Sequence, residues 1–371
     1  MKAMRCLRLW SRLLVSAAAA LLASALGWAA ERPDALWTVA HPRVQEVIAA
    51  QDELTPEVMT FEEILGTAVG FGPDGDLTLV VYADQDHPGV ADVVRAIPPR
   101  LRGVAVTVCL TDKFVALGKP TKPTPEPPVS HTAKQTPPIQ LGTSGGWQYD
   151  LANGYCCGGT LGSLIQIKDT QYILTNYHVI EADIVSGGNS RVAAAGDPVI
   201  QPGLIDVSCN ANNAQNVATL VKSGSLPNSN VDAAIAEVGS GMVSADGAIL
   251  EIGTISSQTV LAFLNQAVKK SGRTTRLTRS KVSGLNATVS VAYENECAGG
   301  AAFTKTFTGQ IIIANRASKF LAGGDSGSLM VQDVTTNPKA VGLLFAGSST
   351  LAVANPIGEV LSFFGATMVG N

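Results

Sequence analysis

The sequence has little charge, and this shortage limits what the protein can be. Only 15% of its 371 residues are charged, against roughly 25% in an ordinary soluble chain. The formal net charge is −4, so the strong basic excess of general nucleic-acid binders is missing. A hydrophobic fraction of 46% excludes a disordered chain, and 37 glycines with 19 prolines indicate many turns rather than a coiled coil.

Near the amino terminus, the apolar run from Leu13 to Leu26 is shorter than the ~20 residues that a membrane span needs. Four cations and no acid precede it, and the small residues Gly27 and Ala29 follow it. This order is typical of a secretory signal peptide. We therefore expect residues 1–29 to be removed on export to an extracellular or periplasmic space, without stable membrane insertion afterwards. An uncleaved anchor or a wrongly extended start is the alternative.

Cysteine is scarce, and no CxxC spacing or Cys/His cluster indicates a zinc site. No metal or organic cofactor is expected. Export makes disulfides plausible, but an odd number of cysteines in the mature chain leaves at least one unpaired or intermolecular. We expect a bridge among Cys156 or Cys157, Cys209 and Cys297. Cys109 is the remaining mature cysteine.

The length exceeds one average domain, and a cluster of prolines between Gly118 and Pro138 predicts a stiff linker over residues 119–139. The unit before it, residues 30–118, is expected to be a small α/β domain with no visible catalytic set. Its predicted helices lie around Val44 to Ile48, over Phe61–Leu65 and over Val90–Ala96, and its predicted strands are Thr67–Phe71, Leu77–Tyr82 and Val104–Leu110. The Asp74-Gly75 pair between the first two strands predicts a hairpin.

The unit after the linker, residues 140–371, contains short apolar or alternating runs. Gly, Asn, Ser or Pro interrupts these runs at short intervals, and long helical periodicity is absent. This spacing predicts an all-β barrel or sandwich built from antiparallel strands.

Three polar residues in this unit stand out by their order. His178 follows a strand-like run, Asp232 begins the apolar segment Val231–Ala236, and Ser326 lies in Gly323-Gly324-Asp325-Ser326-Gly327-Ser328. Each has an ordinary structural explanation when taken alone, since a lone histidine is more often structural and small polar residues form turns. The three together, with spacings of 54 and 94 residues, are much less ambiguous.

In this order and spacing, the residues resemble the trypsin/chymotrypsin-like serine proteases over roughly residues 141–371. Cys157–Ile165 is similar to the family's strand that leads to the histidine, and Lys270–Thr275 resembles the [KR]-x-G-R-T-T segment of its bacterial secreted members. The resemblance implies an all-β, two-barrel, chymotrypsin-like domain. It also implies a secreted serine endopeptidase that acts on protein or peptide substrates.

The resemblance gives each residue a role. Ser326 is the nucleophile, His178 is the general base and then the acid, and Asp232 orients the imidazole. The backbone N–H groups of Gly324 and Ser326 form the oxyanion hole. An α/β-hydrolase is excluded because no histidine follows Ser326. Asp206 stays open as an alternative acid.

The sequence departs from the digestive members of the family in activation and specificity. No Ile-Val-Gly-Gly segment stands ready to become a new amino terminus, so Asp325 is expected to have another partner. By offset from Ser326, Phe320 takes the selector position, and Phe345, Ala346 and Gly347 lie on the strand that pairs with substrate. We expect a small or apolar P1 residue rather than Arg or Lys.

Other functions stay open at this stage. The chain is alternatively a non-catalytic binding or adhesion protein on the same fold, or an esterase with the same triad. Residues 30–118 are expected to form a pro- or regulatory domain acting on the protease cleft, with a targeting module as the alternative. The basic run from Lys269 to Lys281 is expected to be a solvated face, with contact to an anionic substrate or to the cell wall as the alternative.

Overall fold

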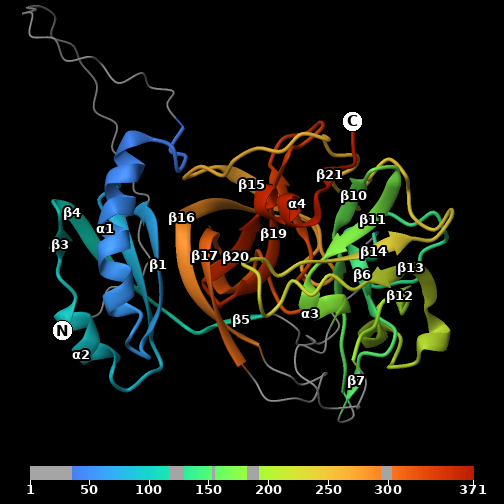
Figure 1. Ribbon diagram of the computed structural model, residues 1–371, viewed down its shortest axis with the longest axis horizontal. Coiled ribbons are helices and arrows are strands. Elements are labelled where there is room, and N and C mark those ends of the chain that lie inside the picture. Colours follow the sequence, from blue (N-terminus) through green and yellow to red (C-terminus); the bar gives the residue numbers. More distant parts are fainter. Residues whose placement is uncertain (1–35, 117–128, 153–154, 182–191, 294–302) are drawn as a thin grey trace, which may run out of the picture.

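The computed structural model describes residues 36–116, 129–152, 155–181, 192–293 and 303–371 (Figure 1). The expected signal peptide and Cys297 lie outside the described residues. The architecture confirms the expected fold class: a small α/β unit precedes an all-β unit with two curled antiparallel sheets. Within the described part of the chain, no helix is long and apolar enough to cross a membrane.

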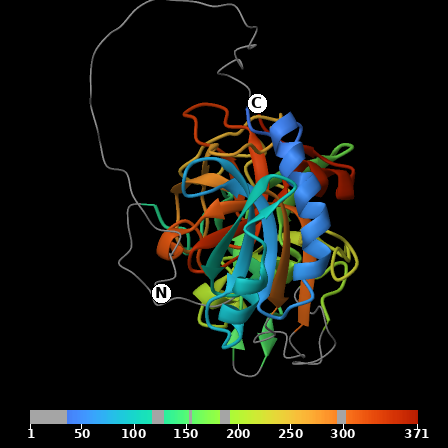
Figure 2. The same cartoon turned by 90° about the vertical axis from the view of Figure 1, so that its left-hand side faces the viewer.

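In the amino-terminal unit, two helices pack on a sheet. Its elements are α1 (Pro42–Val58), β1 (Ile64–Phe71), β2 (Leu77–Asp84), α2 (Val90–Ala96), β3 (Arg100–Leu101), β4 (Val104–Thr111) and β5 (Phe114–Ala116). Val44, Val47 and Leu54 recur at helical spacing along α1 and pack against Leu79 and Val81 of the sheet. Figure 2 shows α1 lying along these strands.

The sequence expectations for this unit hold except at one helix. β1 and β2 form the predicted antiparallel hairpin, and α2 has the predicted bounds. The helix predicted over Phe61–Leu65 is wrong, because β1 begins at Ile64 and a turn precedes it. Ile64 and Leu65 are buried on the sheet, whereas Phe61 is exposed, so strand pairing replaces a helix too short to bury one face.

The first barrel is built around an eight-stranded sheet. In sheet order its strands are β21 (Thr367–Met368), β10 (Ser163–Ile167), β11 (Thr170–Thr175), β14 (Ala234–Val238), β13 (Gln215–Val221), β12 (Pro198–Gln201), β6 (Thr143–Trp147) and β9 (Gly159–Leu161). A small hairpin, β7 (Leu151–Ala152) and β8 (Tyr155–Cys156), stands apart from this sheet. The Cys156–Cys209 disulfide ties the hairpin to the loop that follows the 3-10 turn η1 (Leu204–Asp206). This is one of the expected pairings.

The second barrel closes on itself. Its strands are β15 (Ala267–Lys270), β16 (Thr278–Tyr293), β17 (Phe303–Ala314), β18 (Leu329–Gln332), β19 (Ala340–Gly347) and β20 (Leu351–Pro356). β15 pairs with both β18 and β16, which completes the ring. The short helices α3 (Tyr177–Ile180) and α4 (Ile357–Phe364) and the 3-10 turns η2 (Ala211–Asn213) and η3 (Arg316–Ser318) complete the fold.

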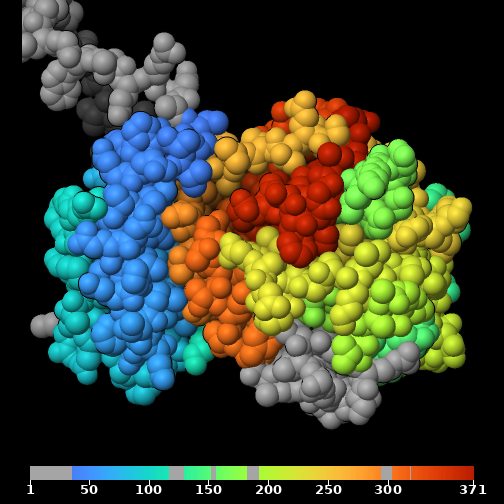
Figure 3. Space-filling model, in the orientation of Figure 1, coloured from blue at the N-terminus to red at the C-terminus, as the bar shows by residue number. Residues whose placement is uncertain are grey.

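The amino-terminal unit continues the sheet of the second barrel. β1 pairs antiparallel with β16, and β5 pairs with β16 and β19. The five strands β1, β2, β3, β4 and β5 thus extend the six-stranded barrel into an 11-stranded sheet. One apolar cluster spans the junction and joins Leu65 and Phe114 to Phe307, Phe345 and Val353. In the space-filling view the blue lobe of the amino-terminal unit lies directly against the orange surface of the second barrel (Figure 3). The junction is therefore packed like a core.

The last part of the predicted linker is packed on the first barrel. His131 is buried, and its ring nitrogens lie 2.7 Å from the carbonyl oxygen of Gly142 and 2.7 Å from a carboxylate oxygen of Glu251. Ile139 is fully buried, and its N–H donates to the carbonyl of Met242. Residues 131–139 therefore belong structurally to the barrel, whereas residues 117–128 lie outside the described part.

Candidate active site

His178 stands on α3, the short helix that follows β11 of the first barrel. Its Nδ1 lies 2.6 Å from Oδ2 of Asp232, and the two side chains are 10% and 0% exposed. The Nε2 atom is buried and has no hydrogen-bond partner among the described residues. The imidazole is thus oriented by a carboxylate at one nitrogen and leaves the other nitrogen available to move a proton.

Asp232 lies two residues before the start of β14, and backbone and side-chain donors fix its carboxylate. Oδ1 accepts from the N–H of Tyr177, at 2.8 Å, while Oδ2 accepts from the hydroxyl of Tyr293, at 2.9 Å. The N–H of Asp232 donates to Oδ1 of Asn355, on β20, at 2.9 Å. Residues from both barrels therefore hold this carboxylate at their junction.

Ser326 lies in the second barrel, in the segment 322–328 that precedes β18, which we call the Ser326 loop. Its carbonyl accepts from the N–H of Thr160 on β9, at 2.9 Å, which ties the loop to the first barrel. A Cβ built on Gly159 would lie 2.6 Å from Val179 and 3.0 Å from the Ser326 carbonyl oxygen. Val179, the residue after His178, and the backbone of Ser326 therefore both lie next to Gly159. The Ser326 loop is thus a neighbour of α3.

Gly324, a predicted oxyanion donor, has a backbone conformation that favours glycine. Its φ is +92°, which disfavours any residue with a β-carbon, and an added Cβ would lie 2.6 Å from Oγ1 of Thr274. The Thr160 hydroxyl donates to the carbonyl of Gly324 at 2.9 Å, which fixes the direction of that peptide. Ser326 is fully buried, and its Oγ lies 3.4 Å from the carbonyl oxygen of Phe345.

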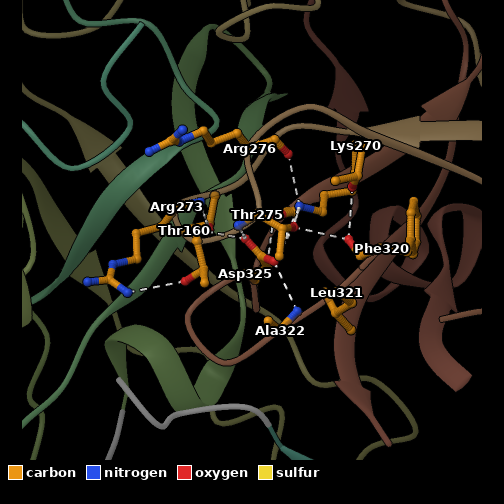
Figure 4. A network of polar contacts seen from close by, with 12 residues as sticks. Thr160, Lys270, Arg273, Thr275, Arg276, Phe320, Leu321, Ala322 and Asp325 are labelled. Carbon is orange, nitrogen blue, oxygen red and sulfur yellow. Dashed lines mark hydrogen bonds and ion pairs between the residues drawn. The ribbon is translucent and has the colours of Figure 1, made fainter. Parts of the chain in front are cut away.

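Asp325 was expected to have a partner other than a new amino terminus, and in the structure this partner is Lys270 (Figure 4). The Lys270 Nζ lies 3.3 Å from Oδ2 of Asp325, and both side chains are fully buried. Burial lowers the pKa of Lys270 below its usual value, and the negative charge of Asp325 opposes this shift. Backbone N–H groups of Thr274, Thr275 and Ala322 also donate to the carboxylate. A cation built into the chain thus neutralises the residue beside Ser326.

Asp206, the alternative acid, has a different role in the structure. Its two carboxylate oxygens accept from Nε and Nη2 of Arg273, and the Ser144 hydroxyl donates to the same carboxylate. Both members of this ion pair are 9% exposed. Because Asp206 is engaged with Arg273, the structure pairs Asp232 and not Asp206 with His178.

The expectation of a solvated face over Lys269–Lys281 is wrong for half of this run. Lys269, Lys270 and Arg273 are buried, because each finds an ion pair or a backbone acceptor. Arg279 and Lys281, later in the run, are exposed. They line a hollow of about 470 Å³ that also borders Phe320. Its lining residues are Thr278, Arg279, Ser280, Lys281, Ala314, Arg316, Lys319 and Phe320.

The expected substrate-contact residues fall into two groups. Phe320 is buried in the apolar core of the second barrel. Its carbonyl oxygen accepts hydrogen bonds from the hydroxyl groups of Thr275 and Thr278. Phe345, Ala346 and Gly347 form the end of β19. β5 of the amino-terminal unit pairs antiparallel with this end, with Ala116 opposite Ala346 and Val115 opposite Gly347. The strand expected to receive substrate therefore already carries a strand from the same chain.

Two further contacts hold the amino-terminal unit at this edge. The Thr111 hydroxyl lies 2.8 Å from the hydroxyl of Ser348, just after β19. The Asp112 carboxylate accepts from the N–H and the hydroxyl of Ser349, at 2.9 and 2.6 Å. The turn before β5 is thus joined to the loop between β19 and β20.

Sequence reasoning missed two residues of the site. Lys270 carried a signal, because it begins the segment that resembles bacterial secreted members, but its charge was assigned to a solvated face. Tyr293 carried no signal, since a tyrosine at the end of an alternating strand is ordinary. Among the described residues, no group of three or more His, Cys, Asp or Glu side chains could hold a metal ion.

No family model matches the chain, and no curated protein matches it. Among solved structures, it is similar to a glutamic acid specific serine protease described as using a histidine triad in substrate binding, with 19% identity and a TM-score of 0.40. That match covers 62% of this chain and 100% of the other. Thermobifida fusca protease A matches with 19% identity and a TM-score of 0.41, over 63% of this chain and 99% of the other. Cellulomonas bogoriensis chymotrypsin matches with 18% identity and a TM-score of 0.39, again over 63% and 99%.

Proposed function

We propose that the protein is a secreted serine endopeptidase that hydrolyses peptide bonds through His178, Asp232 and Ser326. One observation carries this proposal: the 2.6 Å hydrogen bond between His178 Nδ1 and the buried carboxylate of Asp232, beside the loop that holds Ser326. A buried carboxylate that orients an imidazole is the arrangement needed to activate a serine hydroxyl near neutral pH. The Cys156–Cys209 disulfide supports export, because disulfides persist in oxidising compartments.

The chemistry follows from these residues. The Ser326 hydroxyl oxygen attacks the substrate carbonyl carbon, and its proton moves to Nε2 of His178. Asp232 stabilises the resulting imidazolium, while the N–H groups of Gly324 and Ser326 donate to the oxyanion. The imidazolium then gives its proton to the leaving amine, which leaves an acyl-enzyme on Ser326. Water, deprotonated by His178, hydrolyses that ester and restores the hydroxyl.

The amino-terminal unit, residues 30–118, is in this proposal a pro- or regulatory domain that acts on the cleft. Its strand β5 pairs antiparallel with Ala346 and Gly347, as an extended substrate would. Val115 lies opposite Gly347 and Ala116 lies opposite Ala346, so β5 leads toward Phe345. The carbonyl oxygen of Phe345 lies beside the Ser326 hydroxyl. The apolar core shared with the second barrel and the Asp112–Ser349 contacts support a stable, self-covering arrangement.

For the substrate, we propose a small or apolar P1 residue. The barrel core around the predicted selector Phe320 is apolar, and Phe345 and Ala346 are fully buried. No charged group among the residues predicted to contact substrate would pair with Arg or Lys. A cleavage library that returns basic P1 residues would contradict this part of the proposal.

A fluorophosphonate probe, which phosphorylates only an activated serine, tests the catalytic part. We expect the wild-type chain to be labelled at Ser326 and Ser326→Ala to remain unlabelled. Hydrolysis of peptides as well as esters would distinguish a peptidase from an esterase. If neither protein is labelled even when the cleft is open, the non-catalytic binding protein becomes the better reading.

The same probe tests the role of the amino-terminal unit in the full chain. Val115→Pro removes a backbone N–H from β5 and introduces a ring into its paired edge, so it should release this strand. We expect Val115→Pro to be labelled faster than the wild type. The control Val39→Pro changes an exposed residue of the same unit outside the sheet. Equal labelling rates in all three chains would refute inhibition by β5.

A further inference from the structure

The hydroxyl of Tyr293 reaches the carboxylate of Asp232. Tyr293 is the last residue of β16 in the second barrel, whereas Asp232 belongs to the first. The tyrosine Oη donates to Oδ2 of Asp232 at 2.9 Å. This is the same oxygen that lies 2.6 Å from Nδ1 of His178. Tyrosine and histidine therefore converge on one carboxylate oxygen.

Different groups hold the two carboxylate oxygens of Asp232. Oδ1 is fixed by the backbone N–H of Tyr177, which lies next to His178 in the chain. Among the described residues, Oδ2 has two side-chain partners, and Tyr293 is the one that is independent of the imidazole. Without the tyrosine hydroxyl, the position of Oδ2 would depend on the same ring that it has to orient. A second donor therefore defines the plane of the carboxylate and, through it, the tilt of His178.

Aromatic packing preorganises the tyrosine ring. Phe303 stacks on it with centroids 4.8 Å apart and planes 7° from parallel, and Phe307 lies at 6.4 Å. The His178 ring meets it edge-on, with centroids 6.0 Å apart and an angle of 69°. Tyr293 is 2% exposed, so its hydroxyl has no competing bulk water. Holding the donor rigid before reaction is the condition under which a hydrogen bond contributes to positioning.

The phenol of Tyr293 stays protonated and can therefore donate a hydrogen bond. Burial raises the pKa of Tyr293 well above 10, and the negative charge of Asp232 raises it further. The hydroxyl therefore keeps its proton at every pH at which a serine protease works. It can donate to Asp232 but cannot place a second negative charge beside it.

We propose that Tyr293 is a positioning residue of the triad, which fixes the Asp232 carboxylate so that His178 is aligned toward Ser326. This inference rests on the proposed function. It differs from a packing role in its consequence: loss of the phenolic oxygen alone, with the ring still stacked, lowers turnover.

The test compares Tyr293→Phe with wild type in the full chain and in the Val115→Pro background. Turnover of a chromogenic ester gives kcat and KM, and proton NMR follows the low-field Nδ1 proton of His178. We expect kcat to fall roughly ten- to hundredfold with KM unchanged, since hydrogen bonds to charged groups are stronger than neutral ones. The low-field proton should shift or broaden. The comparison variant Phe303→Leu disturbs the stack but keeps the hydroxyl, so its kcat should fall less than that of Tyr293→Phe.

A wild-type kcat and an unchanged Nδ1 resonance in Tyr293→Phe would overturn the inference. So would equal losses of kcat in Tyr293→Phe and Phe303→Leu, because that result indicates packing alone. If the wild type neither turns over ester nor reacts with a fluorophosphonate, the proposed function fails instead. The Nδ1 resonance then still decides whether Tyr293 positions the His178–Asp232 pair.

Discussion

Removing the cation from the Lys270–Asp325 pair should destabilise the fold and impair the site together. Lys270→Met keeps about the length of the side chain but removes the ammonium group. The buried carboxylate of Asp325 is then left without its counter-ion. Breaking a buried pair by removing one partner costs roughly 3–5 kcal/mol. Asp325 would keep donors from Thr274, Thr275 and Ala322, so we place the loss at the lower end, at about 3 kcal/mol.

The activity should fall more than the stability alone explains. Asp325 lies between Gly324 and Ser326, so a shift of its carboxylate moves both expected oxyanion donors. Loss of one such donor typically lowers kcat by about 10²–10³-fold. We therefore expect Lys270→Met to lose at least about 10²-fold in the rate of fluorophosphonate labelling, even at temperatures where it is fully folded.

Urea denaturation and labelling rates measure the two effects. The double variant Lys270→Met/Asp325→Asn removes both charges, and it should be more stable than the sum of the single losses predicts. The exposed pair of Arg279 and Asp333 offers a matched control, and Arg279→Met should change stability by less than about 1 kcal/mol. A loss below about 1 kcal/mol in Lys270→Met would refute the reasoning, because an unpaired buried carboxylate cannot cost so little.

Two other predictions concern the backbone at the site and the alkaline limit of stability. Gly324→Ala should lower kcat by about 10²–10³-fold, since an added Cβ would lie 2.6 Å from Thr274 Oγ1. Gly103→Ala, at φ +84° with open space around its Cβ, should leave kcat unchanged, and steady-state kinetics of both variants would reveal any general strain effect. Above pH 10 the native state keeps the Tyr293 proton that the unfolded chain loses, so this group's contribution to stability falls as pH rises. Urea denaturation between pH 9 and about 11 should show wild type losing up to about 1.4 kcal/mol per pH unit relative to Tyr293→Phe, and parallel curves would contradict this.

The fold class could be predicted from the sequence because its signals are local. Short alternating runs with frequent turn residues specify antiparallel strands, and the Asp74-Gly75 hairpin and the helix Val90–Ala96 formed as predicted. Phe61–Leu65 was mispredicted because its apolar residues serve a strand that pairs with distant segments. The continuation of β1 into β16 joins residues more than two hundred positions apart, and no local pattern encodes that pairing.

The candidate site divides in the same way. The order of His178, Asp232 and Ser326 is visible in the sequence, because each residue sits in a short motif. The contact of Lys270 joins a strand end to a loop of the same barrel, and the contact of Tyr293 joins a strand end to the other barrel. Both depend on tertiary packing. A lysine in a basic run and a tyrosine in an alternating strand have ordinary local explanations. Only the structure reveals that their polar atoms are buried against carboxylates.

The most direct test of the proposed function is hydrolysis of an unfolded protein substrate by the Val115→Pro chain, in which we expect β5 to be released from β19. We expect peptide-bond cleavage that follows Michaelis–Menten kinetics. Introducing Ser326→Ala into this chain should lower kcat by about 10⁶-fold while its urea denaturation curve stays close to that of the parent. Cleavage that survives Ser326→Ala would contradict the account, and so would a folded Val115→Pro chain that cleaves nothing.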